Sequence, residues 1–179
     1  MRAADLFRSA RPAPAWQNLT KTLLQTTVFW TVLLLIVPSW IVRLTVGLPG
    51  ARFTAMPATG AVLFACFGVL GLTCGYTLAS RGEGTPLPLD APRRLVVAGP
   101  YAWVRNPMAI AGLGQGVAVG VWFGSAWVLA YSVVGGVLWN FFVRPIEERY
   151  MLEEFGAQFE DYRRAVRCWI PTVPERRRG

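Results

Sequence analysis

The stretch Leu95-Val-Val-Ala-Gly-Pro-Tyr-Ala-Trp-Val-Arg-Asn-Pro107 lies between two pairs of hydrophobic segments. Its glycine and two prolines break any regular element, and an aromatic pair stands close to Arg105. A second polar cluster, Arg144-Pro-Ile-Glu-Glu-Arg149, follows the last hydrophobic segment. We interpret these two clusters as the halves of one site at a membrane surface.

The composition indicates an integral membrane protein. Hydrophobic residues make up 54% of the 179 residues, and they occur in long runs rather than at amphipathic spacing. The formal net charge is +8, but the arginines flank the hydrophobic runs, as they do around membrane spans. A nucleic-acid partner is therefore not expected, since it would require a basic patch on a soluble fold.

Metal chemistry and histidine chemistry are not expected. The chain has no histidine, and Cys66, Cys74 and Cys168 do not form a C-x-x-C pair, so a zinc site is not predicted. Without histidine the usual nucleophile–base pairs are also missing. Any chemistry must then use carboxylates, arginine, tyrosine, the backbone or a cofactor.

The hydrophobic runs predict an all-α fold with about four transmembrane helices and cytoplasmic amphipathic helices. Each run approaches the ~20 residues that a helix needs to cross a bilayer. The expected spans are 26–46, 57–80, 108–122 and 126–142, the last two forming a hairpin. We divide the chain into a tail (1–22), two spans (23–80), a core of loop, hairpin and C-terminal helices (81–171), and a basic tail (172–179), which includes Arg176–Arg178.

Glycines recur on two of the predicted spans. Gly71 and Gly75 form a G-x-x-x-G pattern that permits close helix packing, although an ordinary glycine-containing membrane helix explains it equally well. Gly112, Gly116 and Gly120 recur every four residues and would let another backbone or a flat group approach.

Charge predicts the topology. With four spans, both termini and the central loop share one side, and only Arg43 and Arg52 remain for the other. Lysine and arginine mark the cytoplasmic face, so both polar clusters are expected there. Beyond Arg144 we expect helix, with Phe155, Phe159, Tyr162 and Val166 forming an amphipathic stripe.

The residue types suggest an anion pocket beside carboxylates. Pro107 suits the first position of a helix, whose free N–H groups would attract a carboxylate or phosphate. Arg144, Glu147 and Glu148 can share one helix end. S-adenosylmethionine, with its amino acid end, ribose and sulfonium, fits such a site. The alternative is that these side chains are only solvated ion pairs and interfacial anchors.

The ordered pieces Leu95-Val96, Gly99–Pro107, Glu147-Glu148, Phe155-Gly156, Tyr162 and Trp169–Pro171 resemble the isoprenylcysteine carboxyl methyltransferase family, a relative of the integral-membrane phospholipid methyltransferases. The resemblance covers about residues 82–171. It implies a multi-span enzyme that uses S-adenosylmethionine to methylate a lipophilic acceptor arriving from the bilayer, with the cofactor held on the cytoplasmic side.

When the family's cofactor-binding positions are transferred to this sequence, the resemblance implies that the following residues contact the cofactor: Leu95, Val96, Tyr101, Arg105, Asn106, Pro107, Met108, Ala109, Glu147 and Glu148. Arg144 would orient the acceptor and is the candidate catalytic residue. Asn106 and Ala109 stand where the family usually has His and Tyr, so a prenylcysteine acceptor is not assumed. The alternatives are a phospholipid N-methyltransferase and a non-catalytic membrane scaffold that keeps the fold. A small transporter is disfavoured, because its spans should carry intramembrane charges, and here only Arg43, near the end of a span, qualifies.

Overall fold

The computed structural model describes residues 13–85 and 91–172, and in this part of the chain every regular element is a helix. The predictions for residues 1–12, for 86–90 and for Arg176–Arg178 fall outside the described residues. The elements in order are α1 (Ala15–Trp30), η2 (Thr31–Ile36), α2 (Val37–Leu44), α3 (Pro57–Arg81), η4 (Gly99–Ala102), α4 (Pro107–Phe123), α5 (Ala126–Leu138), η5 (Trp139–Val143), α6 (Arg144–Phe155) and α7 (Ala157–Ala165).

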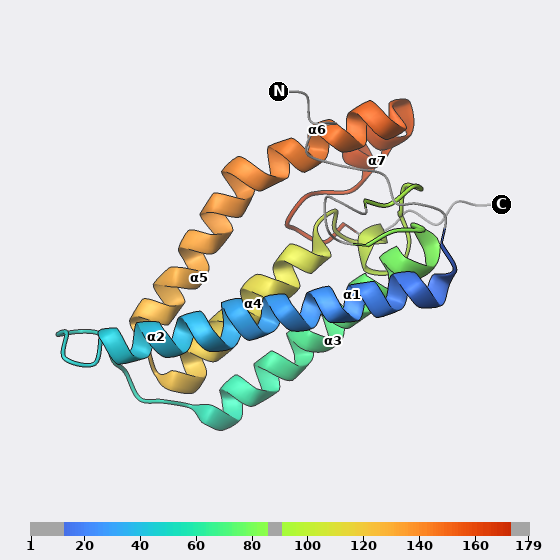
Figure 1. Cartoon of the computed structure of the whole chain (residues 1–179). Coiled ribbons are helices and arrows are strands. Elements are labelled where there is room, and N and C mark those ends of the chain that lie inside the picture. The colour runs from blue at the N-terminus through green and yellow to red at the C-terminus, as the bar shows by residue number, and fades with distance from the viewer. Residues whose placement is uncertain (1–12, 86–90, 173–179) are drawn as a thin grey trace.

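The predicted all-α membrane fold is confirmed. Within the described residues, three helices are long and apolar enough to cross a bilayer, namely Trp16–Leu44, Pro57–Arg81 and Ala126–Phe155. The shorter apolar helix α4 lies among them and completes the hairpin with α5 (Figure 1). In the third long helix about 20 residues from Ala126 suffice to cross hydrocarbon. The membrane-spanning part therefore ends near Val143, and the charged helix α6 lies beyond it.

The first long helix extends ahead of the predicted span 26–46. It starts at Ala15, so residues assigned to the tail form its first turns. The polar side chains of Asn18 and Thr22 in these turns are buried against the protein, which removes them from lipid. The π-helical segment η2 ends at Ile36, two residues before Pro38, whose missing backbone N–H must be accommodated.

Glycines let α3 pack closely on its neighbours, which is one of the two interpretations that the sequence left open. A Cβ atom at Gly75 would lie 2.9 Å from Thr22 Cγ2 of α1, and one at Gly71 would lie 3.5 Å from Ala111 Cβ of α4. On α4 itself, Gly116 and Gly120 face side chains of α5, whereas a Cβ at Gly112 would meet no atom within 4 Å. The glycine-rich face of α4 therefore packs against α5 at one end and leaves a hollow at the other.

The hairpin turn follows from Gly124. Its φ of 59° is left-handed, which glycine adopts without strain, and its N–H donates to the carbonyl of Val121. Ser125 then caps α5 by accepting a hydrogen bond from the N–H of Val128. The turn thus lies where the sequence predicts it, between residues 123 and 125.

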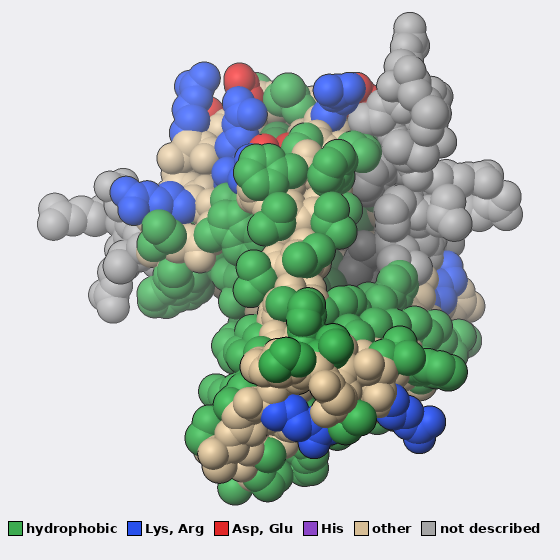
Figure 2. Space-filling model, turned by 90° about the vertical axis from the view of Figure 1, so that its left-hand side faces the viewer, with side chains coloured by type: hydrophobic (Ala, Val, Ile, Leu, Met, Phe, Trp, Pro, Cys, Tyr) green, Lys and Arg blue, Asp and Glu red, His purple; other side chains and the backbone are tan. Residues whose placement is uncertain are grey.

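Both polar clusters lie at the same end of the molecule. The loop before α4 and the helices α6 and α7 meet there, while the α4–α5 turn and the loop after α2 lie at the opposite end (Figure 1). Acidic and basic side chains gather at the first end, and a broad apolar surface separates them from basic side chains at the other (Figure 2). This arrangement is the one expected from four predicted spans, because an even number of crossings returns the chain to the side on which it began.

Gly60→Ala should lower the melting temperature of the detergent-solubilised protein. The added Cβ would lie 2.9 Å from Ala118 O and Trp122 Cα, so the backbones must move apart, at a cost of about 1–3 kcal/mol. The matched control is Gly112→Ala, which meets no atom and gains up to about 1 kcal/mol of helix propensity. Equal melting temperatures for the two variants would contradict this account of α3–α4 packing.

Candidate functional site

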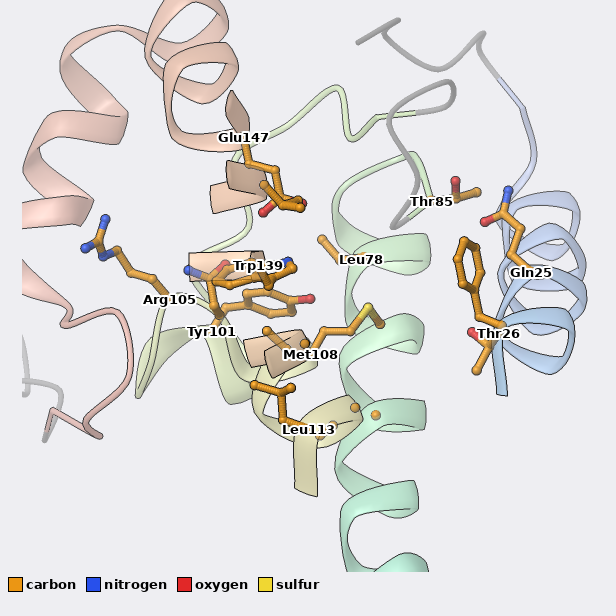
Figure 3. A pocket seen from close by; sticks show the side chains of 18 of the residues that line it. Gln25, Thr26, Leu78, Thr85, Tyr101, Arg105, Met108, Leu113, Trp139 and Glu147 are labelled. Carbon is orange, nitrogen blue, oxygen red and sulfur yellow. The ribbon is translucent and has the colours of Figure 1, made fainter. Parts of the chain in front are cut away.

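A cavity of about 670 Å³ opens from the polar end of the molecule into the helix bundle. This volume lies in the range of ordinary small-molecule sites. Helices α1, α3, α4, α5 and α6 and the central loop all contribute to its wall. Figure 3 shows Glu147 pointing into it from α6, above Tyr101 and Trp139, with Met108 and Leu78 nearby. The cavity therefore joins the two polar clusters to the apolar interior.

Most of the residues that the sequence singles out line this cavity. The lining includes Val96, Tyr101, Arg105, Asn106, Met108, Ala109, Glu147 and Glu148. Leu95, Pro107 and Arg144 are not part of its wall. Arg144 instead borders a separate groove together with Asn140 and Trp169. The structure thus brings the proposed cofactor residues together and sets the candidate catalytic arginine to one side.

Tyr101 is held firmly at the centre of the site. It is buried against Cys74 of α3 and against Val96, and its backbone carbonyl accepts a hydrogen bond of 2.7 Å from the Tyr162 hydroxyl. Burial raises the pKa of Tyr101 well above its ordinary value, with further increments from neighbouring groups that include Glu147. Its hydroxyl therefore stays protonated and can donate a hydrogen bond to a ligand.

Glu148 is an ion-paired carboxylate. Its Oε1 lies 2.8 Å from Arg105 Nη1 and 3.8 Å from Arg144 Nε. The Arg105 and Glu148 side chains are only 12% and 20% exposed, so the pair is partly shielded from solvent. Arg105 points away from the middle of the cavity (Figure 3). This ion pair links the loop before α4 to the start of α6.

Glu147, one residue earlier, has no ion-pair or hydrogen-bond partner among the described residues. Its carboxylate enters the cavity at the end near Tyr101. Burial raises the pKa of Glu147 to about 7, and the negative charge of Glu148 adds to the shift. A half-buried, desolvated carboxylate of this kind is stabilised in its ionised form when a cation binds beside it.

The beginning of α4 faces the same cavity. Asn106 is its N-cap residue, and the free N–H groups of Met108 and Ala109 follow Pro107 in the first turn. The Asn106 side chain does not cap the helix; its Nδ2 donates to Cys168 Sγ at 3.2 Å. The helix terminus therefore remains available to a ligand carboxylate or hydroxyl.

The segment after α7 fastens the two clusters together. The Arg105 N–H donates to the Arg167 carbonyl at 2.9 Å, and the Thr172 N–H donates to the Trp103 carbonyl at 2.7 Å. The indole N–H of Trp169 donates to Asn140 Oδ1 at 2.9 Å. These bonds hold the loop before α4 against the junction of η5 and α6.

Cys168 is the residue in this segment that sequence reasoning missed. Its sulfur accepts hydrogen bonds from Asn106 Nδ2 and from Arg144 Nη1, at 3.2 and 3.6 Å. Cys168 stands in no metal-binding pattern, so the sequence gave no signal that its sulfur accepts these two hydrogen bonds. The contacts with Asn106 and Arg144 form only when the segment after α7 folds back.

The residues present fit a ligand with both cationic and anionic groups. Glu147 offers an uncompensated carboxylate, the α4 terminus offers N–H donors, and Tyr101 offers a neutral hydroxyl. The remainder of the cavity is walled mainly by apolar side chains of α1, α4 and α5. The site can thus hold a charged cofactor at the surface and a lipophilic molecule below it.

The family model described as phospholipid methyltransferase matches residues 55–158 of the chain. The chain is also similar to a protein of Schizosaccharomyces pombe named protein-S-isoprenylcysteine O-methyltransferase. The two are 36% identical over 86 residues, which is 45% of this chain and 34% of the yeast protein. The matched region thus spans about a third of the length of that relative.

Tyr162→Phe should lower the melting temperature and weaken ligand binding in the cavity. It removes the hydroxyl that satisfies the buried Tyr101 carbonyl, a loss of about 1–3 kcal/mol. Tyr76→Phe is the matched control, since Tyr76 is exposed on the apolar surface. Thermal unfolding of both variants in one detergent tests this; an unchanged Tyr162→Phe protein would show that the bond does not stabilise the loop.

Proposed function

The chain belongs to the phospholipid methyltransferase family, and we propose that it transfers a methyl group from S-adenosylmethionine to a lipophilic acceptor in the membrane. The family relationship supports a membrane methyltransferase. The observation that carries the finer proposal is the half-buried Glu147 carboxylate, which has no partner among the described residues and lies in one cavity with Tyr101 and the start of α4. This arrangement complements the charges of S-adenosylmethionine.

Within this proposal each cluster binds one part of the cofactor. The Glu147 carboxylate pairs with a positive charge of the cofactor. The N–H groups of Met108 and Ala109 donate hydrogen bonds to the cofactor's carboxylate or ribose oxygens, and the Tyr101 hydroxyl donates a further hydrogen bond to the cofactor. Glu148 does not bind a cation directly, because Arg105 and Arg144 already neutralise it. Glu148 instead positions Arg105 and the loop that carries Tyr101.

The reaction needs no histidine. The cofactor supplies a methyl group on a sulfonium: the bond from sulfur to methyl carbon breaks, its electron pair stays on sulfur, and the acceptor atom donates the pair of the new bond. The protein's contributions are alignment and exclusion of water. An amine acceptor must arrive neutral, whereas a carboxylate is already nucleophilic.

The cytoplasmic side is proposed for the cofactor. The end that carries the cavity also carries the acidic residues and most of the arginines among the described residues (Figure 2). Short basic loops favour the cytoplasmic face, where S-adenosylmethionine is available. The acceptor would enter from the bilayer, since the lower cavity is enclosed by apolar helices.

Glu147→Gln should weaken S-adenosylmethionine binding by at least about tenfold, as expected for the loss of a buried charge partner. In the wild type the affinity should rise with pH, because the ionised carboxylate is the binding form. With a pKa of about 7, binding at about pH 6 should be roughly tenfold weaker than at about pH 8. Isothermal titration calorimetry in detergent measures both effects.

The control for this substitution is Glu153→Gln, on the exposed side of the same helix. It should keep both the affinity and its pH dependence, whereas Glu147→Gln should lose the pH dependence. A wild type that binds no S-adenosylmethionine in detergent or in lipid would refute the methyltransferase proposal.

Arg144→Ala should reduce turnover more than cofactor affinity. Arg144 borders a groove outside the cofactor cavity, where it can orient an acceptor carboxylate or phosphate. The release of S-adenosylhomocysteine, with a total membrane lipid extract as acceptor, measures turnover; calorimetry measures affinity. Equal losses in both would show that Arg144 supports the cofactor site through Glu148 instead.

A further inference from the structure

Gln115 is a buried amide in the middle of the apolar helix α4. Its side chain has no exposed surface, and neither Oε1 nor Nε2 has a hydrogen-bond partner among the residues that the structure describes. A Cβ atom at Gly68 of α3 would lie 3.5 Å from Nε2, which places the amide nitrogen beside that helix. Nothing in the function described so far uses this side chain.

An unpaired amide at this depth opposes folding. A polar group buried without a partner costs about 1–3 kcal/mol, and the bilayer offers no water in exchange. An apolar side chain of the same shape would avoid this penalty. The fold alone therefore gives no reason for a glutamine at position 115.

Gln115 lines the same cavity as Glu147 and Tyr101. It lies nine positions after the α4 N-cap Asn106, which corresponds to about 13.5 Å along the helix axis. The polar groups nearby on α5 are already satisfied: the hydroxyl of Ser132 donates to the Val128 carbonyl, and that of Tyr131 to the Leu33 carbonyl. In this deeper part of the cavity Gln115 is thus a free donor and acceptor.

The wall beside Gln115 is open. Gly112, one helical turn earlier, and Gly135 of α5 both line the cavity. A Cβ at Gly112 would meet nothing within 4 Å, and one at Gly135 would meet only a Leu113 carbon at 4.0 Å. A flexible chain can therefore pass between α4 and α5 and reach the depth of Gln115.

We propose that Gln115 is a specificity-determining residue that donates a hydrogen bond to an acyl ester carbonyl of the acceptor lipid. This inference rests on the proposed methyl transfer to a membrane acceptor. An acylated lipid carries its ester carbonyls below the reactive headgroup, where they can meet the amide. An isoprenoid hydrocarbon tail has no polar atom at this depth and would leave Gln115 unpaired.

The test compares two phosphatidylethanolamines of equal chain length, one with ester-linked and one with ether-linked chains. Native mass spectrometry of the full chain in detergent, with both lipids in equal amounts, gives the ratio bound. The wild type should prefer the ester lipid about tenfold, as one hydrogen bond allows. Gln115→Met removes the amide at nearly constant volume and should bring the ratio close to one.

The control is Gln25→Met, the same substitution in the same cavity near Thr85. Gln25 Oε1 also lacks a hydrogen-bond partner among the described residues, but an oxygen cannot donate to an ester carbonyl, so this variant should keep the ester preference. A wild type without preference, a preference that survives in Gln115→Met, or one that Gln25→Met also abolishes would overturn the assignment to Gln115. A wild type without an ester preference would overturn the proposal even if neither variant folded.

S-adenosylmethionine titration separates this inference from the proposed function. Gln115→Met should bind the cofactor as tightly as the wild type does. Cofactor binding without an ester preference would refute only the role of Gln115. An ester preference in a protein that binds no cofactor would refute methyl transfer, and with it the acceptor role, leaving Gln115 a lipid-binding residue.

Discussion

The ion pair between Arg105 and Glu148 is the contact on which the site depends. It joins the loop before α4 to the start of α6, two segments 43 residues apart in the chain. Because Glu148 is neutralised by Arg105 and by Arg144, the adjacent Glu147 remains the uncompensated charge in the cavity. Two neighbouring carboxylates thereby differ in their surroundings: Glu148 maintains the geometry, and Glu147, without a partner among the described residues, is the one that we propose binds a ligand.

The surrounding structure keeps this ion pair in place from three directions. Cys74 and Val96 pack beneath Tyr101, the Tyr162 hydroxyl holds the Tyr101 carbonyl, and the chain after α7 bonds to the backbone on both sides of Val104. The site is thus built on a surface loop, but the loop is fixed by membrane helices below and by the C-terminal helices above. Such support would keep the site rigid enough for the proposed alignment of cofactor and acceptor.

The sequence predicted the elements better than their contacts. Pro57, Pro107 and Gly124 each mark a helix boundary through backbone chemistry, so the second span and the hairpin lie close to their expected positions. The helix that contains the first span extends back into the predicted tail, and the burial of Asn18 there could not be read from the local sequence. The juxtaposition of the two polar clusters followed from the even number of spans. The sulfur contacts of Cys168 and the unpaired state of Gln115 depend on tertiary packing, for which the local pattern holds no signal.

The π-helical segment η5 has a consequence for the direction in which the carboxylates point. It lies inside one continuous helix, between the lipid-facing residues of α5 and the charged residues of α6. A π-turn holds one residue more than an α-turn, so all that follows is rotated by about 100° relative to an uninterrupted α-helix. The rotation introduced by the π-helical segment Trp139–Val143 therefore sets which side of α6 faces the cavity. If the same sequence were α-helical throughout, Glu147 would point away from Tyr101.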